Sequence, residues 1–200
     1  MKSKVVTLSI FALTTTLFGC ATTELPATSQ NYNPSNSARI RLFGQNQKPS
    51  IMEVQMDQNE NSRPVKINVG GGLGDAFGSF VGATKSDSIG MAETENTRNL
   101  ASKDGLLSKA FYREFVIPAG RQVKVYSSFI GLSTSYPMAS TDTAVTYRQR
   151  SCTSGTVSFV PQAGKDYEVG FNNNGNVCSV VVFDIQTIEG KTTLVPIQSK

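Results

Sequence analysis

The segment Phe111–Ile130 reads FYREFVIPAGRQVKVYSSFI, and it is the clearest structural signal in the chain. Its two halves, FYREFVI and QVKVYSSFI, are rich in β-branched and aromatic residues, which favour strands. Between them lies Pro118-Ala119-Gly120-Arg121, in which the proline can open a turn and the glycine can adopt a positive φ. The segment therefore predicts a β-hairpin, and a mainly β protein around it.

The same turn pattern occurs a second time further along the chain. Ala119–Val125 reads AGRQVKV and Ala163–Val169 reads AGKDYEV, and a proline stands just before each of them. Thr156–Phe171 is therefore expected to form a second hairpin. A third hairpin is expected across Asn172–Gly175 (NNNG), because Asn and Gly tolerate left-handed backbone conformations. Cys178–Ile185 (CSVVVFDI) then predicts a buried central strand.

Shorter strands are expected on both sides of this region, at Ala38–Phe43, Ile51–Met56, Val65–Val69 and Thr192–Ile197. The first of them, ARIRLF, alternates polar and apolar residues as a half-buried strand does. Roughly nine or ten short strands at this spacing predict a single antiparallel two-sheet sandwich, immunoglobulin-like or related, with a closed barrel as the alternative. The sandwich domain is expected to span residues 38–200.

Residues 70–109 interrupt the β pattern and are expected to form a glycine-rich, partly helical insert. The insert opens with GGGLGDAFGSFVGA, in which Leu73, Phe77, Phe80 and Val81 would share one face of a helix. Two interpretations stay open. These four side chains contact a partner or the membrane surface, or the segment folds over the end of the sandwich and buries them there.

The first twenty residues carry a different kind of signal. Lys2 and Lys4 are followed by an apolar stretch, Val5–Phe18, which is too short to span a bilayer permanently. The pair Gly19-Cys20 closes it. This order, ending in LFGC, resembles the lipobox of bacterial lipoproteins. The resemblance implies that the peptide before the cysteine is removed, that the Cys20 thiol receives a diacylglyceryl group, and that the new amino terminus is acylated with a fatty acid such as palmitate.

The residues after the cysteine extend this interpretation. By resemblance to Gram-negative lipoproteins, Ala21 favours the outer membrane over retention at the inner membrane, on the periplasmic face or at the cell surface. Residues 20–37 are rich in Thr, Ser, Asn and Pro, which predicts a flexible tether. With the signal peptide of residues 1–19 removed, 17 basic residues face 15 acidic ones, a net charge of +2. So small a charge gives no reason to expect nucleic acid as a partner.

Cysteine usage agrees with an envelope location. If Cys20 is lipidated, Cys152 and Cys178 remain, and in an oxidising compartment they are expected to form a disulfide, with two separate thiols as the alternative. The order of an ARIR strand, a PAG turn, a cysteine, an AGKDY turn and a second cysteine resembles small uncharacterised β-sandwich lipoproteins of Gram-negative envelopes. This resemblance covers roughly residues 38–43 and 111–185, and it implies a fold and a location but no activity.

Catalytic chemistry has little basis in the composition. The chain contains no histidine, which excludes His-based triads and histidine-ligated metal sites. Asp166 and Glu168 lie two apart on an expected strand and would share one face, as the paired acids of some glycosidases do. Charged residues on the solvent face of a sandwich are a commoner reason for such a pair. No catalytic residue, metal or cofactor is therefore expected.

These observations favour a non-enzymatic function. The chain is expected to be an outer-membrane lipoprotein that binds another envelope protein or serves assembly, with edge strands and the insert as contact surfaces. The alternative is a small-ligand or glycan-binding module in which Tyr126, Tyr136, Tyr147 and Tyr167 surround a pocket. A hydrolase that uses carboxylates is a third and weaker alternative.

Overall fold

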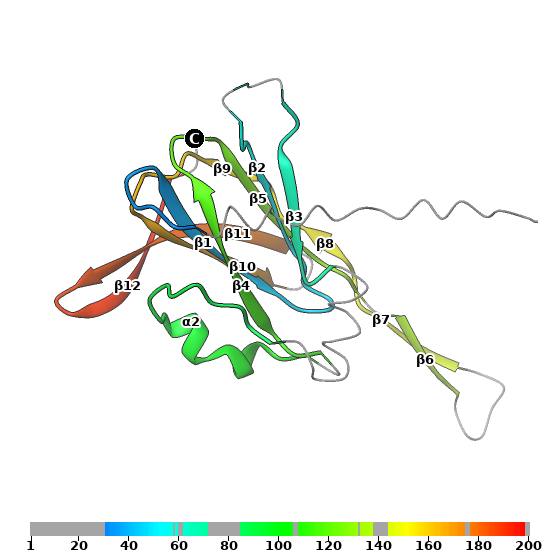
Figure 1. Cartoon of the computed structure of the whole chain (residues 1–200). Coiled ribbons are helices and arrows are strands. Elements are labelled where there is room, and N and C mark those ends of the chain that lie inside the picture. The colour runs from blue at the N-terminus through cyan, green and yellow to red at the C-terminus, as the bar shows by residue number, and fades with distance from the viewer. Residues whose placement is uncertain are drawn as a thin grey trace, which may run out of the picture.

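The structure of the chain is a computed structural model, and it is mainly β. Two sheets face each other across one hydrophobic core and do not close into a barrel (Figure 1). The expected two-sheet sandwich is thereby confirmed. The residues that the structure describes are 31–57, 59, 62–71, 85–105, 108–131, 133–137, 144–174 and 177–198.

The first sheet has five strands in the order β12-β11-β10-β1-β4. Their bounds are Ser37–Gly44 (β1), Phe111–Pro118 (β4), Asp166–Asn174 (β10), Val177–Ile188 (β11) and Lys191–Pro196 (β12). β1 is antiparallel to β4 but parallel to β10. The expectation of purely antiparallel sheets is wrong at this pair, because both strands begin at the same end of the sandwich, after the chain has crossed it several times.

The second sheet has the order β3-β2-β5-β8, and β9 also pairs with β5. Its strands are Ser50–Val54 (β2), Val65–Val69 (β3), Val123–Phe129 (β5), Cys152–Thr153 (β8) and Val157–Phe159 (β9). Two further strands, Ser133–Pro137 (β6) and Ala144–Arg148 (β7), form a separate ribbon. The insert is partly helical, as expected, with α2 (Glu95–Arg98) and the 3₁₀ helix η2 (Leu100–Lys103) ahead of β4.

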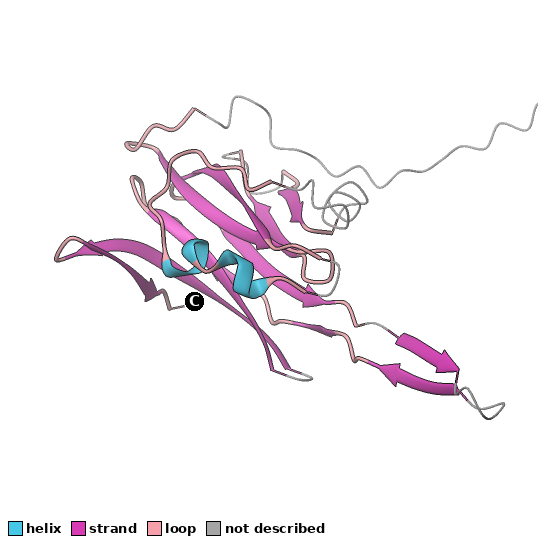
Figure 2. Cartoon of the chain, turned by 90° about the horizontal axis from the view of Figure 1, so that it is seen from below, coloured by secondary structure: helices cyan, strands magenta, loops and turns pink. Residues whose placement is uncertain are grey.

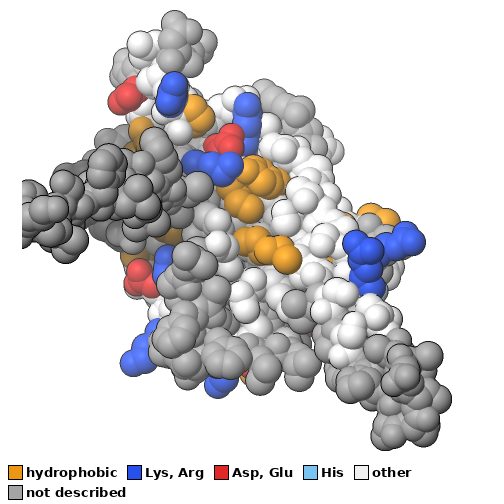
Figure 3. All heavy atoms as spheres, turned by 90° about the vertical axis from the view of Figure 1, so that its right-hand side faces the viewer, with side chains coloured by type: hydrophobic (Ala, Val, Ile, Leu, Met, Phe, Trp, Pro, Cys, Tyr) orange, Lys and Arg blue, Asp and Glu red, His pale blue; other side chains and the backbone are white. Residues whose placement is uncertain are grey.

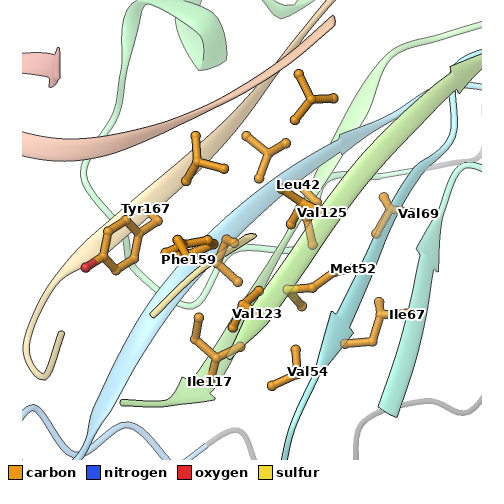
Figure 4. Close-up of a cluster of buried hydrophobic side chains, with 14 of the residues drawn as sticks. Leu42, Met52, Val54, Ile67, Val69, Ile117, Val123, Val125, Phe159 and Tyr167 are labelled. Atoms are coloured by element: carbon orange, nitrogen blue, oxygen red, sulfur yellow. The ribbon is translucent and has the colours of Figure 1, made fainter. Parts of the chain in front are cut away.

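Apolar side chains from both sheets fill the space between them. In β1, Ile40 and Leu42 are 0% exposed in this core, while the arginines that alternate with them point to the opposite face of the sheet. Figure 4 shows Leu42 in one apolar cluster with Met52 and Val125 of the second sheet. The alternation of side chains along each strand therefore places one face of each sheet in the core.

Tyr167 closes the core at one end. Its ring lies 5.1 Å from that of Phe159, and in Figure 4 its hydroxyl points away from the apolar cluster. The hydroxyl accepts a hydrogen bond from the Gln162 N–H (3.0 Å). Burial raises the pKa of the Tyr167 phenol above its ordinary value, so this side chain is a neutral part of the core.

Phe111–Ile130 contains two strands, but it is not a hairpin. β4 pairs with β1 in the first sheet, whereas β5 pairs with β2 in the second sheet, so the turn at Pro118–Arg121 carries the chain from one sheet to the other. Thr156–Phe171 repeats this arrangement, with β9 in the second sheet and β10 in the first. Both expected hairpins are wrong, because the turn residues specify a reversal of the chain but not which strand becomes the hydrogen-bonding partner.

The two crossing turns lie together at one end of the sandwich. The Gly120 N–H donates to the carbonyl oxygen of Pro161 (2.8 Å), and the Gly164 N–H donates to that of Ser37 (2.9 Å). The repeated sequence thus forms two similar turns that support each other and the first residue of β1. We call this region the arch end, and it comprises residues 31–37, 118–122 and 160–165.

Alanine at Gly164 is expected to lower the free energy of unfolding by about 1–2 kcal/mol, because residues with a Cβ are strained in the left-handed region. The φ of Gly164 is +76°, and a Cβ there would lie 3.3 Å from the carbonyl oxygen of Pro34. Gly155→Ala is the matched control, since its Cβ would meet nothing within 4 Å and its φ is not positive. Urea unfolding followed by circular dichroism measures both variants, and equal effects would contradict the turn conformation.

Two true hairpins join the last three strands. β10 and β11 pair antiparallel, which confirms the hairpin expected across Asn172–Gly175. β11 and β12 meet at a turn in which Glu189 and Gly190 have φ values of 50° and 75°. β11 is an internal strand, but it is not fully buried: Val182 is 1% exposed and Val181 is 39% exposed. The expected central position is confirmed, but the expected burial holds for one face of the strand alone, because only its inner face packs on the second sheet.

The chain enters the sandwich at the arch end, and the ribbon leaves from the opposite end. Tyr32 places its ring 4.5 Å from the guanidinium carbon of Arg39, so part of the segment expected as a tether, residues 20–37, is packed against the domain. β5 runs from the arch end to Phe129 and leads into the ribbon. Figures 1 and 2 show the ribbon projecting away from both sheets. We call this opposite end the ribbon end.

Candidate functional site

Asp166 and Glu168 share one face of β10, as expected, but they do not face solvent. They lie on the outer face of the first sheet, which is the face turned away from the core. The side chain of Asp166 is 15% exposed and that of Glu168 is 0% exposed. The expectation of a solvent-facing pair is wrong because residues 85–105 pack over this face of the sheet (Figure 2).

Three charged side chains form a row across the outer face: Glu114 of β4, Arg41 of β1 and Glu168 of β10. They are direct neighbours in the strand register. Arg41 Nη2 and Nε lie 2.6 Å and 2.9 Å from Glu114 Oε1, and Arg41 Nη1 lies 2.8 Å from Glu168 Oε2. No side chain of this trio is more than 1% exposed. We call the trio the buried charge row.

The second oxygen of Glu114 binds the insert. Glu114 Oε2 accepts hydrogen bonds from the Ser88 hydroxyl (2.8 Å), the Ile89 N–H (2.7 Å) and the Met91 N–H (3.2 Å). Arg41 contributes as well, because its Nη2 donates to the carbonyl oxygen of Ala92 (2.9 Å). The charged side chains of Glu114 and Arg41 thereby supply hydrogen-bond partners to backbone groups of the insert that would otherwise be buried without them.

Glu168 fixes the start of α2. The Thr94 hydroxyl donates to Glu168 Oε2 (2.7 Å), and the Asn96 side-chain amide donates to Oε1 (2.6 Å). Thr94 is also the N-cap of the helix and forms a capping box with Thr97. A helix of four residues is too short to persist alone in water, so its position depends on these contacts with the sheet.

Arg39 and Asp166 form a second pair on the same face, nearer the arch end. The Arg39 Nε and Nη2 atoms donate to the two oxygens of Asp166, both over 2.7 Å. Hydrogen bonding to Asp166 raises the pKa of Arg39, and partial burial opposes that shift. Arg39 Nη1 also donates to the carbonyl oxygen of Gly90 (3.2 Å), so this pair too holds the insert against the sheet.

The arrangement is suited to holding structure rather than to acid–base catalysis. A catalytic pair of acids needs room for substrate or water at its oxygens. Every oxygen of Glu114 and Glu168 already accepts a hydrogen bond from this chain. Within the described residues, no group of three or more Asp, Glu, Cys or His side chains could hold a metal ion. The carboxylate pair therefore gives the hydrolase alternative no support.

Cys152 and Cys178 form the expected disulfide, with an S–S distance of 2.05 Å. Cys152 belongs to β8 of the second sheet, and Cys178 belongs to β11 of the first. The bond therefore joins the two sheets covalently. It lies at the ribbon end, because Cys152 is opposite Phe129 in the register of β5 and β8.

Two of the four tyrosines expected around a pocket, Tyr126 and Tyr167, do not come together in one. Tyr167 lies in the core, whereas Tyr126 lies on the outer face of the second sheet, with Lys66 Nζ 5.5 Å from its ring centroid. These two side chains therefore do not face a common cavity. The side chains of Tyr136 and Tyr147 lie outside the described part of the chain.

Five other expected site residues also lie outside the described residues, and the predictions made for them stay predictions. They are the lipidation site and the four apolar residues of the insert: Cys20, Leu73, Phe77, Phe80 and Val81.

The ribbon formed by β6 and β7 is a feature that the sequence analysis missed. Within the described residues, its strands pair only with each other. The hydroxyls of Ser135 and Thr146 are 3.0 Å apart across the pair, and the Ile130 N–H at the base donates to the carbonyl oxygen of Gln47 (2.8 Å). The β-branched and aromatic residues of AVTYR are the sequence signal that could have revealed it.

The surface and the comparisons with known proteins complete the description of the candidate site. On the face shown in Figure 3, Lys and Arg side chains are spread over separate places and do not gather in one basic patch. No protein-family model matches the chain, and no curated protein or solved structure matches it either. Among the described residues, no helix has the length and apolar character needed to cross a membrane.

Proposed function

We propose that this chain is an outer-membrane lipoprotein of a Gram-negative envelope, anchored through Cys20, that binds another envelope protein through the ribbon and has no enzymatic activity. The observation that carries the proposal is the position of the ribbon, which leaves the sandwich at the end opposite to the arch end. A domain tied to the bilayer at the arch end would direct its ribbon away from the membrane.

The length of the tether fits this orientation. The turn at Asn33–Ser37 is part of the arch end, so only the residues before it are left for the tether that the sequence predicts. If residues 21–31 are the flexible tether that the sequence predicts, this stretch of chain would reach roughly 18 Å. Such a tether keeps the arch end near the headgroups and leaves the ribbon end at the far side of the domain.

The ribbon has the properties of a strand-pairing surface. A two-stranded ribbon is only marginally stable in water, and its outer edges carry N–H and C=O groups that can pair with another strand. The described side chains on it are polar and exposed, among them Ser133, Ser135, Thr146 and Arg148. A partner that adds a strand to one edge would gain main-chain hydrogen bonds and stabilise the ribbon at once.

Site-specific photo-crosslinking in cells tests the ribbon as the contact surface. A photoreactive residue at Ser135 is expected to form an adduct with one envelope protein in the lipidated chain. The same residue at Val160, which is 51% exposed at the arch end, is the matched control and is expected to give no such adduct. Equal adducts at both positions, or none at Ser135, would argue against the ribbon as the binding surface.

The anchor is tested separately. Cys20→Ala is expected to abolish incorporation of labelled palmitate and to move the protein from the membrane fraction to the soluble fraction, because acyl chains supply the membrane affinity. The disulfide offers a control for folding, since Cys152 and Cys178 should remain oxidised in the variant. A Cys20→Ala protein that still sediments with membranes would contradict the lipid anchor.

A further inference from the structure

A pocket of about 360 Å³ opens at the ribbon end. It lies between β1, the loop that follows it, η2 and the last residues of β10, and Gln149 closes it on the side of the ribbon. Its volume is within the range of small-ligand sites. None of its lining residues belongs to the buried charge row or to the two strands of the ribbon. We call it the end pocket.

The charge of the end pocket is of one sign. Lys48 and Lys103 are the charged residues of its lining, which contains no acidic residue. Within the described part of the chain, neither ammonium group takes part in an ion pair. Amide side chains account for much of the remaining polar lining, among them Asn172 and Gln149. An anion in the pocket would therefore meet two positive charges and neutral hydrogen-bonding groups.

One buried residue, Gln45, holds the backbone of both lysines. The side-chain Nε2 of Gln45 donates to the backbone carbonyl oxygens of Lys103 (3.1 Å) and Ser108 (3.0 Å). The backbone carbonyl oxygen of Gln45 accepts a hydrogen bond from the Lys48 N–H (2.9 Å). Gln45 is 4% exposed. Although the two lysines are far apart in sequence, the segments that carry them are therefore fixed to the same point, and little ordering of the backbone is needed when a ligand binds.

Apolar surface lies next to the charges. Lys103 Nζ is 5.7 Å from the centroid of the Phe43 ring, and Phe129 and Phe171 also line the pocket. The disulfide supports two walls, because its cysteines stand opposite Phe129 and Asn173 in their strand pairs. The pocket therefore combines two cationic side chains with aromatic surface, as sites for amphipathic small molecules do.

We propose that the end pocket binds a small organic anion, with a carboxylate or phosphate group held by Lys48 and Lys103 and an apolar part lying against Phe43. This site is separate from the ribbon, and it would place a ligand at the base of the surface proposed for the protein partner. The inference does not depend on the lipid anchor or on the partner.

Fluorescence titration of the purified protein with anilinonaphthalene sulfonate tests the proposal, because this probe joins an anionic group to an aromatic body. The variant Lys48→Gln/Lys103→Gln is expected to bind the probe about tenfold or more weakly, since charge-assisted hydrogen bonds are lost. Binding of the uncharged N-phenylnaphthylamine is expected to change by less than about twofold, because its contacts with the aromatic surface remain. Added salt should weaken only the charged probe.

A matched control and competitors make the result specific. Lys191→Gln removes an exposed lysine at the start of β12 and is expected to leave the affinity unchanged. Displacement of the probe by benzoate but not phenyl phosphate would assign a carboxylate, and the reverse would assign a phosphate. Equal displacement by uncharged benzyl alcohol, or equal affinity of the double variant and the wild type for the sulfonate probe, would overturn the proposal. Crosslinking from Ser135 tests the ribbon alone, so its outcome is independent of whether the end pocket binds an anion.

Discussion

Arg41→Met is expected to lower the free energy of unfolding by about 3–5 kcal/mol, the largest effect of any single substitution considered for this protein. The guanidinium is 1% exposed and lies between Glu114 and Glu168, which are both 0% exposed. Its removal leaves two buried carboxylates without a countercharge, and desolvation of an unpaired charge is strongly unfavourable. Urea unfolding of the purified protein, followed by far-ultraviolet circular dichroism, gives the free energy.

The matched control is Lys66→Met. Lys66 also forms an ion pair on a sheet surface, with Glu53 at 3.6 Å, but its side chain is 57% exposed. Exposed ion pairs contribute about 0–1 kcal/mol, so this variant should unfold almost like the wild type. An effect of Arg41→Met as small as that of Lys66→Met would mean that water reaches the buried charge row. That result would contradict the burial of its three side chains.

A compensated variant separates charge from packing. Arg41→Met combined with Glu114→Gln and Glu168→Gln is expected to recover part of the lost stability, because no uncompensated charge is left and the amides keep some hydrogen bonds to the insert. Limited proteolysis supplies a local readout. Cleavage within residues 85–105 should rise in Arg41→Met, since the partners of Ser88 and Thr94 are disturbed.

Removal of the disulfide by Cys152→Ala/Cys178→Ala is expected to have the second large effect. On the chain-entropy model it lowers the free energy of unfolding by about 3–4 kcal/mol. The sequence separation of 26 residues sets the length of the loop that is no longer closed in the unfolded chain. For a domain of this size, each kcal/mol lowers the melting temperature by about 2–4 °C, so a decrease of roughly 6–16 °C is expected. Thermal unfolding measures it.

The reduced wild type is the control for the disulfide variant. A reducing agent should lower the melting temperature of the wild type towards that of the double alanine variant and should leave the variant itself unchanged. A melting temperature of the oxidised wild type that equals that of the variant would contradict a contribution from the cross-link between β8 and β11.

The positions of most strands in the two sheets could be predicted from the sequence. The alternation of polar and apolar side chains and the residues of the turns depend only on neighbouring residues. Ala38–Phe43 and Val65–Val69 agree with β1 and β3 to within a residue. The cysteine pair was predicted correctly on grounds of compartment alone. The ribbon was missed because both of its strands have only five residues and the first, STSYP, is mostly polar, so the strand-forming residues of AVTYR had no recognisable partner strand beside them.

The candidate sites were harder to predict, because each depends on contacts between distant parts of the chain. Arg41 alternates with Ile40 and Leu42 in a pattern typical of a strand with one face in water, and only the insert turns that face into a buried one. The end pocket likewise joins Lys48 and Lys103 through Gln45. No local pattern in the sequence indicates either arrangement.

By itself, the sequence determined where most strands of the two sheets and their turns lie, that these strands have apolar faces to bury, and that one cysteine pair was available. These features depend on φ and ψ preferences and on side-chain alternation, which act over a few neighbouring residues. Tertiary structure alone decided that the PAG and AGK turns cross between sheets, that β1 pairs parallel with β10, and that Arg41 is buried. Strand pairing and burial depend on which distant surfaces meet, and the free energy of that choice comes from the whole core and the insert that covers it.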